Sequence, residues 1–261
     1  MSDHGKHRSY VVTGGGRGIG RAVVERLLGD GGHVAVVELD PSALGWLAGQ
    51  PHALPVVGDA ADDAVAERAA DAAEERAPLS GWVNNAAAFR DASVHTSPAR
   101  EVLGLVEANL APTLVGCTTA VRRFLAAGAG GAIVNVSSHQ AQRAVPGCTP
   151  YVTAKAAIEG LTRALAVEYG ARGVRVNAVA LGSIATERYA AFLAGLGPDG
   201  AAQVGEEMRR IHPVGRVGTT AEVAATIAHL LSDEAGFLTG ATVPIDGGRG
   251  VLARDPEAHD V

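Results

Sequence analysis

Lysine is almost absent from this sequence. Of its 22 lysine and arginine residues only two are lysines, Lys6 in a polar N-terminal segment and Lys155 four residues after Tyr151. Elsewhere the chain uses arginine for positive charge. A lysine kept at this position indicates that a compact, rotatable ammonium with three donors is required there. The alternative is that Lys155 is a leftover surface lysine. The residues around it have to decide between the two.

Long hydrophobic runs are also missing. The longest, Val34–Val37 and Ile227–Leu231, are far shorter than the roughly 20 residues that a membrane-spanning helix needs. Residues 1–9 are polar and lack the apolar stretch of a signal peptide. We therefore expect no membrane association and a cytoplasmic location.

Cysteine, metal-ligand spacings and positive charge are scarce as well. Cys117 and Cys148 form no C-x-x-C pair, as is typical of a chain in a reduced compartment. The nine histidines show no H-x-x-x-H spacing, so we expect no metal site. A net charge of −6 without a basic stripe argues against nucleic-acid binding.

Glycine and short apolar runs, by contrast, are abundant. The 261 residues are 47% hydrophobic and include 34 glycines. Short β-rich runs alternate with longer helical patterns, which indicates parallel strands joined by helical crossovers. Strands are expected at Ser9–Thr13, His33–Glu38, Leu54–Val57, Gly81–Asn84, Ala132–Ser137, Val174–Val179 and Thr242–Ile245. Helices are expected at Gly18–Leu28, from Pro41, near Asp62–Arg76, and at Arg100–Ala127, Pro150–Tyr169 and Glu222–Leu231. This pattern predicts an α/β, single-domain Rossmann-type doubly wound sheet of about seven parallel strands with helices on both faces.

The chain shows no linker or repeat. We expect one domain over residues 1–261, with tails at 1–8 and 250–261 that are flexible or contact other subunits. The stretch 183–216 is long, punctuated by glycine and partly helical. It is interpreted as a substrate-loop insertion at the C-terminal end of a strand, where α/β sheets bind their ligands.

A glycine-rich turn, Thr13-Gly14-Gly15-Gly16-Arg17-Gly18-Ile19-Gly20, follows the first strand and opens the first helix. Glycines allow a sharp turn and a close approach of the backbone, and the helix N-terminus offers free N–H groups to a pyrophosphate. A glycine-rich turn by itself is weak evidence, but the strand-turn-helix context favours a dinucleotide site.

An acidic residue on the second strand is expected to accept the ribose hydroxyls of the cofactor. Glu38 lies 18 positions after Gly20, and Asp40 is the fallback if the strand ends later. A carboxylate here favours NAD, because it would repel the 2′-phosphate of NADP. Arg17 argues the other way if its guanidinium is free to bind that phosphate. We predict NAD, with NADP the less favoured alternative.

These motifs, in this order, resemble the short-chain dehydrogenase/reductase family from Tyr10 to about Gly248. The glycine turn resembles T-G-x-x-x-G-x-G, and Tyr151 with Lys155 matches Y-x-x-x-K. Further matches are Asp59 for the adenine, Asn84-Asn85-Ala86-Ala87 for N-N-A-G, the helix residue Asn109, the segment Leu181 to Thr186 for P-G-x-x-x-T, and Asp246-Gly247-Gly248. Ala87 replaces a glycine and Leu181 replaces the proline. The predicted cofactor contacts are Gly14, Gly16, Arg17, Gly18, Ile19, Gly20, Glu38, Asp59, Ala60, Asn85, Ala86, Ala87, Tyr151, Lys155, Gly182, Ile184 and Thr186.

Tyr151 and Lys155 are four residues apart in a helix that Thr149 and Pro150 can start, so they share one face. A free tyrosine has a pKa of about 10 and is a poor base at pH 7. One positive charge at about 4 Å is worth roughly 4 kcal/mol at an effective dielectric constant of ~20. The ammonium is therefore predicted to lower the pKa of Tyr151 towards working pH, where acid/base catalysis is most effective.

The family resemblance implies the remaining roles. Its spacing selects Ser138, 13 residues before Tyr151, over Ser137 as the serine that hydrogen-bonds the substrate oxygen. It also implies that Lys155 holds the nicotinamide ribose, that Asn109 helps to hold a water leading to the lysine, and that Thr186 contacts the carboxamide. The alternative for Asn109 is that its side chain satisfies a helix kink.

The substrate itself is not identified. After Ser138 come His139, Gln140, Gln142 and Arg143, which form either a solvated loop or, with Arg143 as a carboxylate or phosphate partner, part of a site for a polar or anionic substrate. Tyr189 and Phe192 either form an apolar lid or pack the insertion helix.

The leading hypothesis is an NAD(H)-dependent oxidoreductase for a secondary alcohol or ketone, with Tyr151 as general acid/base. The alternatives are an NADPH-dependent 3-oxoacyl-thioester reductase and a non-catalytic NAD(P)-binding regulator. The long helices at Arg100–Ala127 and Pro150–Tyr169 resemble those that pair between subunits in the family, so we expect a homotetramer or homodimer.

Overall fold

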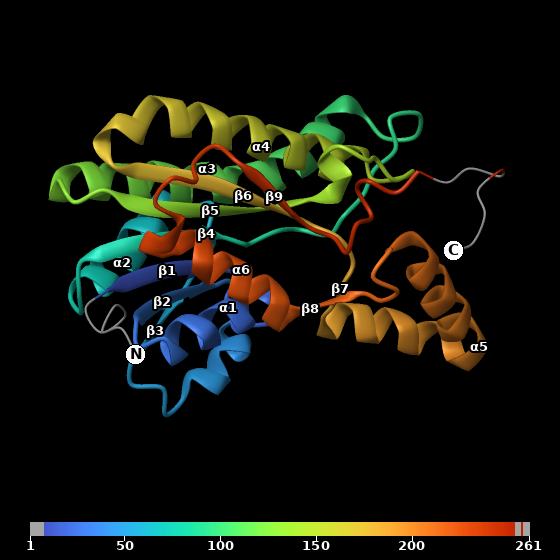
Figure 1. Ribbon diagram of the computed structural model, residues 1–261, viewed down its shortest axis with the longest axis horizontal. Helices are drawn as coiled ribbons and strands as arrows, with labels where there is room; N and C mark the ends of the chain where they lie inside the picture. Colours follow the sequence, from blue (N-terminus) through green and yellow to red (C-terminus); the bar gives the residue numbers. More distant parts are fainter. Residues whose placement is uncertain (1–7, 254–256, 258–261) are drawn as a thin grey trace.

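Seven parallel strands form one sheet through the middle of the protein (Figure 1). The computed structural model describes residues 8–253 and residue 257. The sheet order is β3-β2-β1-β4-β5-β6-β9, and each neighbouring pair runs parallel. The strands are β1 (Ser9–Thr13), β2 (His33–Glu38), β3 (Ala53–Val57), β4 (Leu79–Asn84), β5 (Gly131–Ser138), β6 (Val174–Leu181) and β9 (Thr242–Ile245). The predicted doubly wound α/β fold is confirmed.

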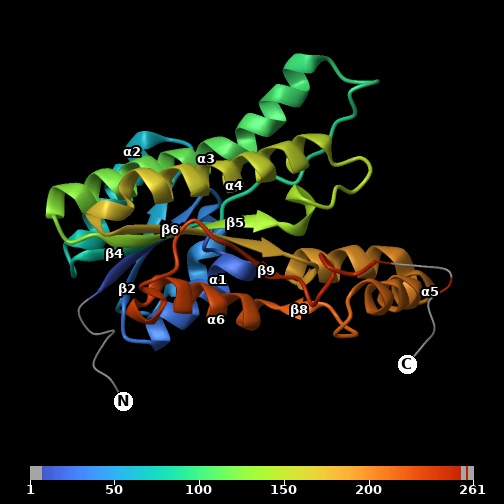
Figure 2. The same cartoon turned by 45° about the horizontal axis from the view of Figure 1, so that its top comes forward.

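Helices cover both faces of the sheet. Helices α2 (Asp63–Glu74), α3 (Ala99–Ala127) and α4 (Thr149–Tyr169) lie on one face, and α1 (Gly18–Gly29) and α6 (Thr220–Leu231) lie on the other (Figures 1 and 2). Short 3-10 helices complete the layers: η1 (Pro41–Leu47), η2 (His139–Ala141), η3 (Gly170–Arg172) and η4 (Asp233–Ala235).

Apolar residues fill the strands because the sheet is buried from both sides. Successive residues of β1 point to opposite faces: Val11 packs among α2 and α3, whereas Val12 packs among α1 and α6. The run Val34–Val37 alternates in the same way, and its four residues are at most 1% exposed. The two cores thus explain why strands of a parallel sheet are apolar throughout.

The strand order reverses beside β1, and this positions the site. The chain proceeds from β1 outwards to β2 and β3, then returns to place β4 on the other side of β1. A crevice opens at such a switch point, outside the carboxyl ends of the strands, and α/β sheets bind ligands there. The glycine turn follows β1, Asn85 follows β4, and Ser138 ends β5, so all three reach this edge.

The segment after β6 forms a separate helical projection. Helix α5 (Glu187–Ile211) has no buried residue and lies outside the main layers, joined to them through the small sheet of β7 (Ile184–Ala185) and β8 (Gly218–Thr219) (Figure 1). Gly197, with φ of 72°, interrupts the helix ahead of Pro198. The stretch predicted as partly helical is therefore mostly helix, while β7 and β8, too short to show a pattern, were missed.

Helix α3 is the one helix in the described part of the chain that is long and apolar enough to cross a membrane. Length and composition are weak evidence, because a helix of a layered α/β protein can satisfy both. In this fold α3 packs on α4, α2 and β4.

The predicted terminal tails lie largely outside the described residues. At the one end, Arg8 forms an ion pair with Asp233. At the other, the backbone N–H of Gly250 donates to Asp246 Oδ2 at 2.6 Å, and Arg143 Nε donates to the carbonyl of Gly250 at 3.1 Å. Both described ends are held against the body of the protein.

Candidate active site

The glycine turn is tied to the end of β4 by hydrogen bonds. The Thr13 hydroxyl accepts from the backbone N–H groups of Asn85 and Ala86 at 3.1 and 3.2 Å. Asn85 Nδ2 donates to the carbonyls of Thr13 and Gly14 at 3.1 and 2.9 Å. A Cβ at Gly20 would lie 2.0 Å from the Gly14 carbonyl oxygen, so only glycine permits this packing. The turn after β1 and the segment after β4 form one rigid unit.

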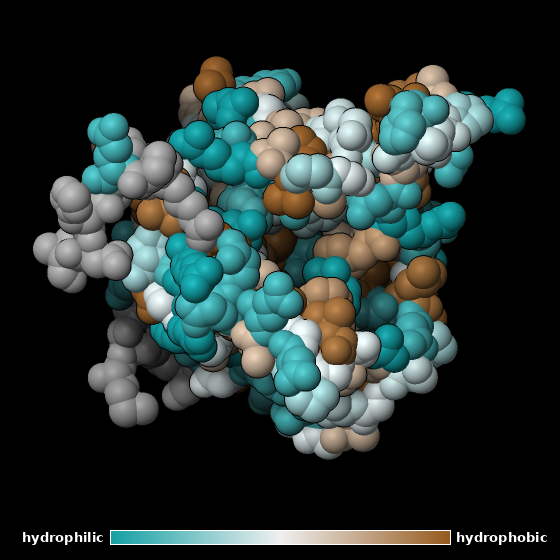
Figure 3. All heavy atoms as spheres, turned by 90° about the vertical axis from the view of Figure 1, so that its right-hand side faces the viewer, coloured by the Kyte–Doolittle hydropathy of each residue, from teal (hydrophilic) through white to brown (hydrophobic). Residues whose placement is uncertain are grey.

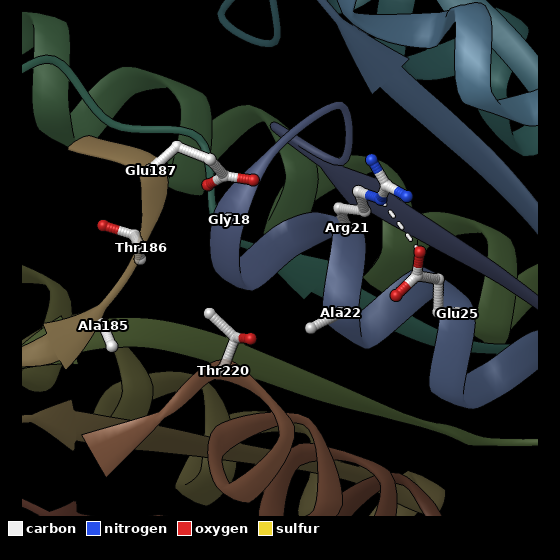
Figure 4. A pocket seen from close by; sticks show the side chains of 8 residues that line it. All are labelled: Gly18, Arg21, Ala22, Glu25, Ala185, Thr186, Glu187 and Thr220. Carbon is white, nitrogen blue, oxygen red and sulfur yellow. Dashed lines mark hydrogen bonds and ion pairs between the residues drawn. The ribbon is translucent and has the colours of Figure 1, made fainter. Parts of the chain in front are cut away.

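Helix α1 begins without a side-chain cap. Arg17 occupies the N-cap position and makes no capping hydrogen bond. The first N–H groups of a helix then lack partners and attract an anion. A cavity of about 270 Å³ opens beside this end, between the starts of α1, α5 and α6; it is lined by Gly18, Arg21, Ala22, Glu25, Ala185, Thr186, Glu187 and Thr220 (Figure 4). The uncapped N–H groups fit a bound pyrophosphate, whereas the cavity also holds two carboxylates, Glu187 and Glu25, the latter ion-paired with Arg21 at 2.8 Å.

Glu38 ends β2 beside the turn. Its Oε2 accepts from the backbone N–H of Gly16 at 3.0 Å, and its Oε1 accepts from Leu39 N at 2.9 Å. A Cβ at Gly16 would lie 2.8 Å from Glu38 Oε2. The carboxylate thus lies at the end of the second strand, beside the glycine turn. In the protein alone its oxygens accept hydrogen bonds from backbone N–H groups.

Arg17 is not free to bind a phosphate in this arrangement. Its Nη2 contacts Asp40 Oδ2 at 2.5 Å. Hydrogen bonds from Ser42 and Arg17 lower the pKa of Asp40. The structure therefore gives Asp40 the role of partner to Arg17. Trp46, which the motifs did not single out, donates from Nε1 to the Gly16 carbonyl at 3.1 Å.

The other predicted cofactor contacts fall along the same edge. Asp59 is exposed after β3, where its Oδ1 accepts from Ala61 N at 2.9 Å. Thr186 caps α5 by accepting from Tyr189 N at 3.3 Å. At Gly182, a Cβ would lie 2.8 Å from the Asp246 Cα, which explains the glycine there.

Lys155 is buried rather than a surface lysine. It is 2% exposed, and its Nζ donates to the Val136 carbonyl at 2.8 Å. The ammonium lies 5.4 Å from the centre of the Tyr151 ring. Burial lowers the pKa of Lys155 to about 8. The alternative of a leftover surface lysine is excluded.

Ser138 and Tyr151 meet in front of this lysine. Burial raises the pKa of Tyr151, and a side-chain hydrogen bond with Ser138 works against that rise. The predicted lowering of the tyrosine pKa is therefore wrong for the protein alone. The physical reason is that desolvation of the phenol outweighs the nearby charges, and the ammonium of Lys155 is directed to the Val136 carbonyl.

Ser137 points away from Ser138, as alternation on a strand requires. Its hydroxyl donates to Glu159 Oε1 at 3.1 Å, and Glu159 Oε2 accepts from Gln142 Nε2 at 3.1 Å. Glu159 is only 4% exposed. This buried carboxylate joins β5, α4 and the segment after Ser138. Its position eight residues after Tyr151 on one helix face was a signal that sequence reasoning could have used.

Asn109 is fully buried in α3, with both amide groups engaged. Its Oδ1 accepts from Ala88 N at 3.1 Å and its Nδ2 donates to the Leu105 carbonyl at 3.1 Å. Pro112 follows within the same helix. In the protein alone Asn109 thus joins α3 to the segment after β4, and no contact brings it to Lys155.

The polar segment after Ser138 is not uniformly solvated. His139 is 8% exposed, with its Nδ1 at 3.0 Å from the Leu181 carbonyl, whereas Arg143 is exposed and bonded to Gly250. Phe192 on α5 is 51% exposed. Among the described residues no group of three His, Cys, Asp or Glu side chains could hold a metal ion.

Comparison with known proteins identifies the family. A family model described as enoyl-(acyl carrier protein) reductase, of the short-chain dehydrogenase/reductase type, matches residues 14–249. Levodione reductase of Leifsonia aquatica is 34% identical over 251 residues, covering 93% of this chain and 94% of that protein. The chain belongs to the short-chain dehydrogenase/reductase family. Members of this family are oxidoreductases that use NAD(P)(H).

A solved structure and a further relative also match nearly the whole chain. A crystal structure of levodione reductase superposes with a TM-score of 0.86 at 30% identity, over 96% of this chain and 100% of the other. The 3-oxoacyl-[acyl-carrier-protein] reductase FabG of Chlamydia muridarum is 30% identical, covering 93% of this chain and 97% of that protein. The resemblance seen in the motifs therefore extends to the entire fold.

Proposed function

We propose that this short-chain dehydrogenase/reductase transfers a hydride between NAD(H) and a secondary alcohol or ketone, with Tyr151 as the general acid/base. The observation that carries the proposal is the buried cluster of Lys155, Tyr151 and Ser138 at the carboxyl ends of the strands. It lies on the same edge as the uncapped start of α1. A non-catalytic NAD(P)-binding regulator would need Lys155 for the ribose but would have no use for a proton-transferring Tyr151 hydrogen-bonded to Ser138.

The residues divide the work as follows. A bound NAD(H) would supply the hydride acceptor for oxidation of the alcohol and the hydride donor for reduction of the carbonyl. Ser138 donates a hydrogen bond to the substrate oxygen and so stabilises the charge that develops there. Tyr151 accepts the hydroxyl proton during oxidation and donates it during reduction. The ammonium of Lys155, directed to the Val136 carbonyl in the protein alone, would hold the nicotinamide ribose when the cofactor is bound and would there favour the phenolate.

In the protein alone, the pKa of Tyr151 favours carbonyl reduction over alcohol oxidation. Because burial raises this pKa above the usual value, the phenol is protonated at neutral pH. A protonated phenol is the form that carbonyl reduction needs. Oxidation requires its deprotonation, which the positive charge of an oxidised nicotinamide would favour.

We propose NAD rather than NADP because one carboxylate lies beside the glycine turn and the arginine of the turn is already paired. Glu38 lies against the glycine turn, and Asp40 neutralises Arg17, the one cation of the turn. A 2′-phosphate would meet negative charge there. NADPH-dependent 3-oxoacyl-thioester reduction is the second candidate, since the FabG relative matches nearly the whole chain.

The test is a steady-state comparison of NAD⁺ with NADP⁺ over a panel of secondary alcohols, and of NADH with NADPH over ketones and a 3-oxoacyl thioester. Absorbance of the reduced nicotinamide is the readout, and Tyr151→Phe is the control for acid/base chemistry. We expect turnover with NAD(H) that the Tyr151→Phe variant loses. A clear preference for NADPH and the thioester would instead support the second candidate.

We also infer the assembly and its setting. Leu103, Leu114 and Val167 are 66%, 48% and 86% exposed on α3 and α4. Leu103 lies near the start of α3 and Val167 near the end of α4, so they form no single patch, and the pairing of the two helices between subunits is inferred from the family resemblance. We propose a cytoplasmic homotetramer or homodimer formed through these helices, with residues 183–216 as the substrate-loop insertion. Sedimentation of the purified protein at micromolar concentration measures the number of subunits.

A further inference from the structure

The entrance to the proposed site carries one guanidinium that the chemistry above does not use. Arg188 lies in the first turn of α5, and its guanidinium carbon is 3.7 Å from the centre of the Phe89 ring. The Phe89 ring is in turn 6.0 Å from that of Tyr151. Arg188 and Phe89 belong to segments 99 residues apart in the chain, and both converge on the proton-transferring tyrosine. Figure 3 views this end of the molecule, where the surface is hollowed between the main layers and α5.

The side chain of Arg188 makes a cation–π contact with Phe89. It has no hydrogen bond or ion pair with any residue that the structure describes. Several other arginines among the described residues are paired; Arg216, for example, makes two contacts with Glu222, at 3.0 and 2.6 Å. A guanidinium that rests flat on a ring keeps its in-plane N–H donors free. Two of these donors can form parallel hydrogen bonds to the two oxygens of one carboxylate.

The charge of Arg188 reaches the reactive phenol. It lowers the pKa of Tyr151, whereas Asp91 and the thiol of Cys148, which also face this phenol, act in the opposite direction. Burial and the hydrogen bond from Ser138 are the larger influences. The two ring contacts, 3.7 Å from Arg188 to Phe89 and 6.0 Å from Phe89 to Tyr151, place the guanidinium within 9.7 Å of the Tyr151 ring. A small substrate bound by Ser138 and Tyr151 can span this distance with its far end.

We infer that Arg188 binds a carboxylate of the substrate, so that the enzyme acts on hydroxy acids and their oxo acids in preference to neutral alcohols and ketones. This inference rests on the proposed function, since it assigns the substrate class of the same site. Phe89 positions the guanidinium, and the reaction is otherwise unchanged: the carboxylate is neither oxidised nor reduced. Arg143, for which this role was one of two alternatives open from the sequence, is bonded to the Gly250 carbonyl instead.

The experiment compares unbranched oxo acids, from 2-oxo to 5-oxo, with their neutral primary amides as substrates with NADH. For the best acid, we expect Arg188→Gln to raise KM by about 10-fold or more, the magnitude of a partly exposed charge-assisted hydrogen bond, with kcat nearly unchanged. The matching amide should keep its kcat/KM within about 3-fold, and Arg188→Lys, which keeps the charge but loses the two-donor fork, should retain only part of the preference for the acid. A purely structural role for Arg188 would lower the rates for acid and amide together.

Two variants serve as controls. Arg76→Gln removes an exposed arginine just before β4, at the opposite edge of the sheet, and should leave the preference for acids unchanged. Arg143→Gln tests the rival arginine. Equal kcat/KM for acids and amides in the wild type, or a loss of preference in Arg143→Gln but not in Arg188→Gln, overturns the inference while leaving the proposed function intact.

A binding experiment distinguishes failure of this inference from failure of the proposed function. Calorimetric titration of the NAD⁺-loaded protein with succinate, and with succinamide, requires no turnover. If no substrate is turned over but succinate binds better than its diamide, and does so through Arg188, the proposed function fails and the anion site stands. Equal binding of the two probes, or succinate binding unaffected by Arg188→Gln, overturns the anion site.

Discussion

Burial of Lys155 carries a cost that can be measured. The pKa of the ammonium falls from 10.5 to about 8 because the side chain is desolvated, and the Val136 carbonyl is its hydrogen-bond partner. At about 1.36 kcal/mol per pKa unit, the charged form is destabilised by about 3 kcal/mol. Lys155→Met replaces the ammonium with a neutral side chain of similar length, and so removes this penalty at neutral pH.

The sign of the pH dependence follows from the lowered pKa. Between pH 8 and 10.5 the unfolded state keeps the proton on Lys155 and the folded state releases it. The wild-type free energy of unfolding therefore rises with pH through this window, and the penalty is present in full only below pH 8. The methionine variant lacks this rise. Its stability relative to the wild type should be about 2.5 kcal/mol higher at pH 7 than at pH 10.

Urea unfolding of the cofactor-free protein at the two pH values measures this difference. Both proteins should carry Tyr151→Phe, because Tyr151 lies against the lysine and its phenol, with a pKa of about 10 in the unfolded chain that burial raises on folding, would add a pH dependence of its own. The hydrogen bond lost at Val136 shifts the two curves by a constant and leaves their pH dependence unaffected. Parallel curves for lysine and methionine would refute the reasoning, since they would mean that the buried ammonium is not desolvated.

Three further predictions address the site. Lys155→Arg keeps the charge but replaces a compact ammonium with a planar guanidinium, so kcat should fall by about 100-fold or more with the circular dichroism spectrum unchanged. Because burial raises the pKa of Tyr151, alcohol oxidation should speed up with rising pH and carbonyl reduction should slow; a profile of kcat/KM against pH that is flat in both directions would exclude this tyrosine as the acid/base. Glu38→Gln should shift the ratio of kcat/KM for NAD⁺ and NADP⁺ by about 10-fold or more towards NADP⁺, because a carboxylate repels the 2′-phosphate; an unchanged ratio would remove the argument for NAD.

The fold could be predicted because its signals are local. The apolar run of β2 and the glycine turn after β1 each depend on neighbours within a few residues, and both lie where they were expected. Strand ends were less certain: β4 begins two residues earlier than predicted and β6 continues to Leu181. Those ends are fixed by pairing with neighbouring strands, which a local pattern does not contain.

The site could be predicted only in part, for the same physical reason. Spacing on one helix brought Tyr151 and Lys155 together, but it gave the wrong direction for the tyrosine pKa. Desolvation depends on what the rest of the chain packs around the phenol, and no local pattern reports that. The pairing of Arg17 with Asp40 and the stacking of Arg188 on Phe89 are likewise tertiary contacts.

Reduced nicotinamide formed from NAD⁺ and a secondary alcohol, by the wild type and by Tyr151→Phe, tests the central claim most directly. The account predicts turnover by the wild type that exceeds that of the phenylalanine variant by at least about 100-fold, since general acid/base catalysis contributes 10²- to 10⁴-fold. Binding of NAD⁺ should be nearly equal in the two proteins. Equal turnover by both would contradict the account, as would tight NAD⁺ binding without turnover of any alcohol, ketone or oxo acid.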